Sequence, residues 1–203
     1  MKNFTFIDLF AGIGGFRIAC ENLGGKCVFS SEWDKHAQKT YAYNFRETPF
    51  GDITNEAIKC LIPKQFDLLC AGFPCQAFSI AGYQKGFNDT RGTLFFDIAD
   101  IVDRHRPKAI FLENVKNLKN HDKGNTFNII KHTLENMGYA VYDKIMNALE
   151  YANIPQNRER IFIVCFDQKQ IPNHTSFSFP DKIPLSTKIN DIIDYNENSK
   201  KLF

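Results

Sequence analysis

The 203-residue sequence has no apolar run approaching the ~18 residues of a membrane-spanning helix, and no signal peptide precedes Phe4. It also has no internal repeat and no clear second domain. These absences argue against a membrane protein and a repeat protein. The content of hydrophobic residues, 43%, is enough to bury the core of one ordinary soluble domain. We expect a cytoplasmic protein with no membrane partner.

Cysteine is present but lacks the spacing of a metal site or a disulfide framework. Six cysteines, at positions 20, 27, 60, 70, 75 and 165, form no CxxC pair and have no accompanying histidine spacing. We therefore expect no metal and a reducing compartment. The net charge of +2 neither demands nor excludes nucleic acid. A complete DNA-binding protein usually has a clearer basic footprint, so part of a binding surface is expected elsewhere.

Apolar runs of strand length alternate with helical patterns along most of the chain. This alternation is typical of βαβ units and predicts an α/β fold. The expected strands span 5–10, 26–31, 66–71, 109–112, 139–149 and 161–166, and the expected helices span 16–23, 34–45, 93–106 and 126–137. After residue 167 the pattern weakens, with one short helix-like run at 189–193 and a frayed end.

A glycine-containing turn, Gly12-Ile13-Gly14-Gly15, follows the first strand, and Glu32 follows the second. An acid about 20 residues after such a turn suits the hydroxyls of a ribose. The turn is not a full GxGxxG, which disfavours a pyrophosphate-binding dehydrogenase. The alternative is a tight turn with an exposed glutamate, because such motifs have false positives.

Cys75 is the candidate nucleophile. It follows a buried strand that ends at Gly72, and Pro74 makes the approach to it stiff. Glu113 occupies the matching position after the next apolar strand, which makes it a candidate acid; an exposed glutamate is the alternative. Arg158 and Arg160 enter the last strand two residues apart and point to one face, although a charged turn explains them equally well.

Three loops complete the candidate site. The loop Gln76–Gly92 is long enough to predict a lid. The loop with Lys116, Lys119, His121 and Lys123 is read as solvated surface, with phosphate contact as the sharper interpretation. The turn at Asp52 is consistent with a helix cap at Thr54 and nothing more.

Five separated motifs together resemble the DNA (cytosine-5)-methyltransferases, in particular the bacterial type II restriction–modification enzymes, from about Phe4 to Phe166. They are Asp8 to Gly15, Glu32-Trp33, Gly72 to Gln76, Glu113-Asn114-Val115 and Gln156 to Arg160. The resemblance implies a Rossmann-like methyltransferase fold, with a mostly parallel sheet, helices on both faces and an antiparallel last strand. It divides the chain into a catalytic and cofactor-binding domain, 1–166, and an extension, 167–203, leading towards an absent target-recognition domain.

The same resemblance implies S-adenosylmethionine as methyl donor, S-adenosylhomocysteine as product, and double-stranded DNA as substrate. In the family, the glycine loop holds the methionine part, the acid binds the ribose, and the aromatic residue packs on the adenine. Carried over to this sequence, the cofactor residues are Phe10, Ala11, Gly12, Ile13, Gly15, Glu32, Trp33, Asp52, Ile53, Pro74 and Leu94. For Asp52, this role replaces the interpretation as a simple turn.

Carried over likewise, Cys75 attacks carbon 6 of a flipped-out cytosine, Glu113 and Arg160 hold the base, and Arg158 positions this group. The lid residues Gln76, Ser79, Gln84 and Arg91 are expected to contact DNA. The family has a recognition region and a final helix beyond the last motif here. We therefore expect a split enzyme with a second polypeptide, or a truncated one. The alternatives are an inactive binding fragment, a tRNA cytosine-5 methyltransferase and, against the glycine spacing, a nicotinamide dehydrogenase.

Overall fold

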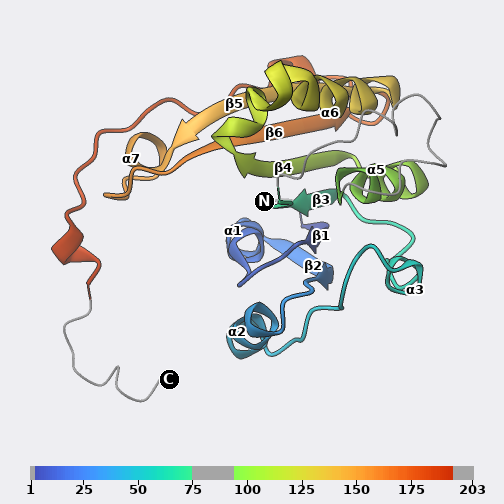
Figure 1. The fold of residues 1–203 in the computed structure, drawn as a ribbon, viewed down its shortest axis with the longest axis horizontal. Helices are drawn as coiled ribbons and strands as arrows, with labels where there is room; N and C mark the ends of the chain where they lie inside the picture. Colours follow the sequence, from blue (N-terminus) through green and yellow to red (C-terminus); the bar gives the residue numbers. More distant parts are fainter. Residues whose placement is uncertain (1–2, 75–93, 194–203) are drawn as a thin grey trace.

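Six strands form one mixed sheet in the computed structural model, which describes residues 3–74 and 94–193 (Figure 1). In spatial order β2-β1-β3-β4-β6-β5, they are β2 (Gly25–Ser31), β1 (Phe4–Leu9), β3 (Leu68–Ala71), β4 (Ala109–Val115), β6 (Glu159–Asp167) and β5 (Tyr139–Asn147). The first four are parallel to one another, and β6 runs antiparallel to both β4 and β5. This confirms the predicted mostly parallel sheet with an antiparallel last strand.

Helices lie on both faces of this sheet. They are α1 (Gly15–Asn22), α2 (Lys35–Phe45), α3 (Glu56–Lys59), α5 (Leu94–His105), α6 (Asn125–Asn136) and α7 (Ala148–Tyr151). Asp34 caps α2 as predicted, because its carboxylate accepts the N–H groups of His36 and Ala37. Among the described residues, no helix is long and apolar enough to cross a lipid bilayer.

Two apolar layers hold the sheet between the helices. Alternation along each strand sends one set of side chains to α5 and α6 and the other set to α1. The first layer includes Ile7, Leu9, Leu69, Ile110 and Leu112, packed with Phe95, Ile98, Ile101, Ile130 and Leu134. The second, smaller layer contains Phe6, Cys20, Cys70, Phe16 and Phe111. The face under α1 therefore also carries the side chains of Asp8 and Glu113, which continue the same alternation.

A chain segment rather than a helix covers the β5–β6 part of the α1 face. Phe177 packs its ring against those of Tyr142 and Phe166, at centroid distances of 5.4 and 5.2 Å. Further on, the Ile183 N–H donates to the carbonyl of Glu150 in α7 at 2.7 Å. The described residues after β6 thus follow β5 to α7, and Figure 1 shows them leaving the sheet beyond that helix.

The structure differs from the expected elements at short helices. The helix α3 is capped by Asn55 and not by Thr54. The strand β5 ends at Asn147 rather than at residue 149, because the Asn147 side chain accepts the Leu149 N–H and starts α7. Helices of four residues leave no periodic pattern in a sequence, so side-chain caps decide where these begin.

The turn between β1 and α1 depends on a glycine at position 14. Gly14 has φ +98°, and a Cβ there would lie 2.1 Å from Cε2 of the Phe45 ring in α2. Gly15, the next residue, has open space at its Cβ position. A side chain at position 14 would therefore require the Phe45 ring to move, in addition to the strain of the positive φ.

We predict that Gly14→Ala lowers the free energy of unfolding by at least about 2 kcal/mol, since both the backbone strain and the ring contact are unfavourable. The matched control is Gly15→Ala, which we expect to change stability by less than about 1 kcal/mol. Urea denaturation followed by circular dichroism measures both. Equal stabilities of the two variants would contradict the role of the Phe45 contact.

Candidate active site

The strand order reverses between β1 and β3, and the carboxyl ends of these two strands mark this switch point. From β1 the chain passes to β2 at one edge, and it then returns past β1 to β3. Open α/β sheets bind ligands at such a point. Three loops meet there: the Ala11 N–H donates to the Ser31 carbonyl at 3.0 Å, and the Ser31 hydroxyl donates to the Gly51 carbonyl at 2.7 Å.

Glu32 links two of these loops through its carboxylate. One oxygen accepts the Gly12 N–H at 2.8 Å, and the other accepts the Asp34 N–H at 2.9 Å. The residue is only 7% exposed. An ionised carboxylate has about four acceptor positions, so about two remain for hydroxyl donors of a ligand. The glutamate is thus held in place, which excludes the alternative of a turn with an exposed acid.

The other predicted cofactor residues of the first two loops lie on the segment that Glu32 binds through Gly12, or directly after Glu32. Trp33 follows it directly and is 74% exposed, so its indole face is open. Ile13 is also exposed, and neither Gly12 nor Gly15 has an atom within 4 Å of a Cβ position. Phe10 starts the loop with φ +54°, a strained value for a residue with a side chain. Ala11 is buried beneath them.

The remaining predicted cofactor residues lie on three other segments. Asp52 is exposed, and its carboxylate accepts the Thr54 N–H at 2.9 Å. The Ile53 side chain packs in the main core and is 2% exposed, so it is not open to a ligand. Pro74 is exposed at the end of the segment after β3, and the half-buried Leu94 begins α5.

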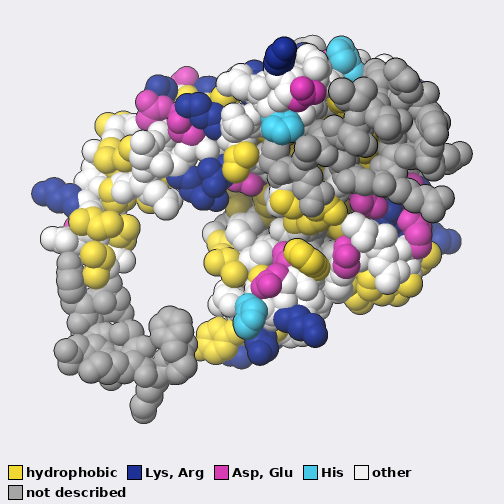
Figure 2. All heavy atoms as spheres, viewed as in Figure 1, with side chains coloured by type: hydrophobic (Ala, Val, Ile, Leu, Met, Phe, Trp, Pro, Cys, Tyr) yellow, Lys and Arg dark blue, Asp and Glu magenta, His cyan; other side chains and the backbone are white. Residues whose placement is uncertain are grey.

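Glu113 forms an ion pair with Arg160 across β4 and β6. The Arg160 Nε lies 2.9 Å from Oε1 of Glu113, and Nη2 of Arg158 lies 4.0 Å from the same oxygen. The antiparallel register places Arg160 opposite Val115, so both arginines project from the face that carries Glu113. The structure therefore brings together three of the four predicted catalytic residues. In Figure 2, Lys and Arg side chains lie above the open space between the body of the molecule and the segment after β6.

The segment that leads to Cys75 is tied to the strand end carrying Glu113. A Cβ on Gly72 would lie 3.6 Å from Oε2 of Glu113, and the buried Asn114 amide donates to the Phe73 carbonyl at 2.8 Å. Sequence reasoning did not assign a role to Asn114, although it directly follows the candidate acid. Cys75 itself and the predicted DNA contacts Gln76, Ser79, Gln84 and Arg91 lie outside the described residues, as does the predicted lid.

Asp8 is a second residue that sequence reasoning did not single out. It lies on β1 between Ser30 and Cys70, is 1% exposed, and neither carboxylate oxygen has a hydrogen-bond partner among the described residues. Burial raises the pKa of Asp8 to about 7, against the lowering effect of Arg17, and nearby Glu32 adds to the rise. A carboxylate inside the apolar run Phe6-Ile7-Asp8-Leu9 was the available signal.

Two lysines of the predicted basic loop are engaged in ion pairs. Lys116 lies 2.7 Å from a carboxylate oxygen of Glu159, and Lys119 pairs with Asp143. They attach the turn after β4 to β6 and β5, which argues against phosphate contact by these two. In the described ranges, no group of three or more His, Cys, Asp or Glu residues is arranged to hold a metal ion.

The sheet order and the anchored carboxylate after β2 define the class of protein. It is a Rossmann-like α/β protein, with a mostly parallel sheet whose last strand is antiparallel. A crystal structure of S. pombe Dnmt2 methyltransferase superposes with a TM-score of 0.64 at 20% identity, covering 81% of this chain and 50% of that chain. At this identity the likeness concerns the fold alone.

Residues 4–202 match the family described as C-5 cytosine-specific DNA methylase, and the chain belongs to this family. The predicted family is thereby confirmed. Type II methyltransferase M.HpaII of Haemophilus parainfluenzae is 61% identical over 193 residues, which cover 94% of this chain and 53% of that protein. For M.HhaI of Haemophilus parahaemolyticus the identity is 53%, covering 95% and 58%. The chain thus spans a little over half the length of these relatives.

We predict that the free energy of unfolding of the native protein, measured relative to Asp8→Asn, falls as the pH rises from about 4 to about 7. Between its ordinary pKa of 3.8 and its folded pKa of about 7, Asp8 binds a proton more tightly in the folded state. Asparagine does not titrate. At about pH 8 the free energy of unfolding of the variant should therefore rise by up to a few kcal/mol relative to the native protein, at about 1.4 kcal/mol per pKa unit.

Urea titrations at about pH 5 and about pH 8 measure this difference. Asp181→Asn, at an exposed position after β6, is the control and should show the pH dependence of the native protein. The same pH dependence in Asp8→Asn would show that Asp8 is not a buried acid with a raised pKa.

Proposed function

We propose that this chain carries the cofactor-binding and catalytic part of a DNA (cytosine-5)-methyltransferase of a restriction–modification system. The observation that carries the proposal is the meeting of Glu113 with Arg160 beside the anchored segment that leads to Cys75. Membership in the C-5 cytosine-specific DNA methylase family supports the choice of reaction and of duplex DNA over tRNA.

The residues present fit S-adenosylmethionine as cofactor. Glu32 keeps acceptor positions for the ribose hydroxyls, and Trp33 offers an open aromatic face for the adenine. Open space around Gly12 and Gly15 leaves room for the methionine part close to the amino end of α1. Asp52 and the Ile53 backbone on one side, and Pro74 and Leu94 on the other, complete this proposed pocket. When bound, the cofactor supplies an electrophilic methyl group on a sulfonium.

The proposed reaction uses the chain's own residues to make cytosine carbon 5 nucleophilic. The Cys75 thiolate forms a bond to carbon 6, which converts the ring to an enamine that accepts the methyl group at carbon 5. Loss of the carbon 5 proton to a base then breaks the bond between sulfur and carbon 6. Covalent catalysis of this type divides one difficult step into easier ones.

Glu113 and the arginines hold the base during these steps. In the proposal, the Glu113 carboxyl contacts ring nitrogen 3 and the exocyclic amine, and Arg160 donates to the carbonyl oxygen. Arg158, further from Glu113, helps to position the group. Positive charge beside the ring also favours the thiolate, because a free cysteine with a pKa of ~8.5 is mostly protonated at neutral pH.

The target cytosine must leave the duplex to reach this group, at a cost of a few kcal/mol. In the proposal, Gln76, Ser79, Gln84 and Arg91 contact the DNA around the flipped base. We assign recognition of the target DNA sequence to a region that corresponds to the part of the relatives that this chain does not cover. A second polypeptide or further chain would supply that region. Nucleoid association follows from DNA binding.

We predict that Cys75→Ser abolishes covalent trapping on a duplex that contains 5-fluorocytosine, since no thiolate remains to attack carbon 6. Cys60→Ser is the matched control, because Cys60 is exposed on the far end of α3, and it should trap like the native protein. A gel shift under denaturing conditions measures the adduct. Persistent trapping by Cys75→Ser would refute the assignment of the nucleophile.

The same assay includes two further comparisons. Trapping or methyl transfer is measured with duplex DNA and with tRNA, and with and without the product of the neighbouring open reading frame. Transfer to tRNA alone would support the tRNA methyltransferase instead. Activity only with the second polypeptide would support the split enzyme, and cofactor binding without any transfer would support a binding fragment.

We predict that S-adenosylmethionine quenches the intrinsic fluorescence of the protein, since Trp33 is its single tryptophan and is open to stacking. Titration gives the Kd. Glu32→Gln should raise that Kd about tenfold, because hydrogen bonds to a charged group contribute about 1.5–3 kcal/mol. Methionine, which lacks the adenine of the cofactor, is the ligand control. No spectral change with the native protein would argue against the proposed cofactor site.

A further inference from the structure

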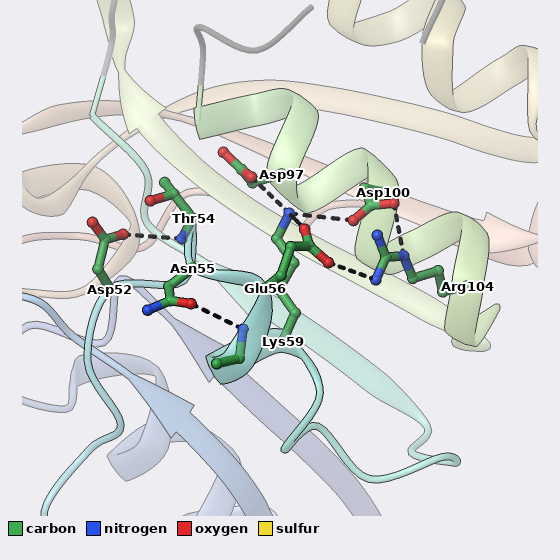
Figure 3. Close-up of polar contacts among 9 residues, drawn as sticks. Asp52, Thr54, Asn55, Glu56, Lys59, Asp97, Asp100 and Arg104 are labelled. Atoms are coloured by element: carbon green, nitrogen blue, oxygen red, sulfur yellow. Dashed lines mark hydrogen bonds and ion pairs between the residues drawn. The ribbon is translucent and has the colours of Figure 1, made fainter. Parts of the chain in front are cut away.

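A buried lysine joins α3 to α5 and belongs to none of the residues assigned above. The side chain of Lys59 is 6% exposed, and its ammonium lies 2.8 Å from Asp97, 2.9 Å from Glu56 and 3.2 Å from Asp100 (Figure 3). Arg104 links two of the same carboxylates, at 3.0 Å from Glu56 and 2.8 Å from Asp100. We call these five residues the Lys59 network.

The network satisfies the lysine completely. An ammonium has three N–H donors, and three different carboxylates each supply one acceptor. Burial acts to lower the pKa of Lys59, but the hydrogen bonds with Asp97 and Glu56 outweigh it and raise the pKa above its ordinary value. An exposed ion pair contributes little, whereas removing one partner of a buried pair leaves charges uncompensated. Without Lys59, Glu56 and Asp100 would keep their ion pairs with Arg104, whereas Asp97 would lose its ion pair with the lysine.

The lysine end of the network is connected by local hydrogen bonds to the turn at Asp52. The Asp52 carboxylate accepts the Thr54 N–H, its carbonyl accepts the Asn55 N–H at 3.1 Å, and the Asn55 side chain accepts the Ala57 N–H to start α3 (Figure 3). A helix of four residues has little stability of its own, so tertiary contacts decide where it lies. Lys59 and Glu56 supply the polar contacts of α3 with α5, and Ile58 packs on the core.

The other end of the network, at Asp97, lies at the beginning of α5. Asp97 is in the first turn of that helix, three residues after Leu94, and residues at this spacing share a helix face. Phe95, in the same turn, contacts the ring of Phe73 in the segment after β3, at a centroid distance of 6.2 Å. The network therefore fixes the first turn of α5 relative to the turn at Asp52.

We infer that Lys59 is a positioning residue for cofactor binding, which holds the Asp52–Ile53 side of the pocket at a fixed distance from the Leu94 side. The inference rests on the proposed function, because that proposal assigns both sides to the adenine. Lys59 does not touch the cofactor; it acts through Asp97 and through the turn that precedes α3.

The test is the Kd of S-adenosylmethionine for the full chain, measured by the fluorescence of Trp33. We expect Lys59→Met to raise the Kd about tenfold or more, in the range of ordinary coupling between sites. Asp97→Asn, which keeps the lysine and removes one charge, should give a smaller rise, about threefold. Asp97→Asn also tests the inference if Lys59→Met does not fold. The matched control is Lys108→Met, which breaks the pair of Lys108 with Asp67 (2.6 Å) at the amino ends of β3 and β4 and should leave the Kd within about twofold.

Circular dichroism and a urea titration accompany each binding curve. A lower stability of folded Lys59→Met and Asp97→Asn with an unchanged Kd would show that the network is structural only and would overturn the inference. An equal rise in the Kd for these variants and for Lys108→Met would overturn the inference as well. If the native chain fails to bind S-adenosylmethionine, the proposed cofactor site is wrong and the inference falls with it.

Discussion

The register between β3 and β4 is the constraint on which the candidate site depends. Ala71 pairs with Leu112, so the next residues, Gly72 just beyond β3 and Glu113 within β4, lie side by side. A shift by one residue would send Glu113 to the opposite face of the sheet, among the side chains that pack on α5. Burial of Leu69 and Leu112 on that opposite face makes such a shift costly, so the apolar core fixes the position of the acid.

The reversed direction of β6 supplies the charges that Glu113 needs. A parallel strand at this place would present its carboxyl end, far along the chain from Arg158 and Arg160. Because β6 is antiparallel to β4, its first residues lie at the carboxyl end of β4, and alternate side chains reach Glu113. The acid and its cations are thus held by backbone pairing on rigid strands, whereas the cofactor-side carboxylate, Glu32, is held by N–H groups of two loops.

The sequence was sufficient to predict the features that depend on local pattern. Apolar runs located the strands, and polar residues at their ends located Glu32, Glu113 and the two arginines. Contacts between distant segments left no such pattern: Asn114 anchors the Phe73 carbonyl, and Lys59 reaches carboxylates on another helix. The burial of Ile53 was equally hidden, since a single isoleucine in a polar turn gives no periodicity. Long-range electrostatics and packing require the fold to be known.

The uneven cover of the α1 face has a geometric consequence. The helix α1 packs on β1, on β3 and, through Phe16, on Phe111 of β4, whereas Phe177 packs on Phe166 of β6 and Tyr142 of β5. Phe166 pairs with Ala109, at the opposite end of β4 from Glu113. Under the proposed function, this ring packing would brace the last two strands away from the place of the extruded base.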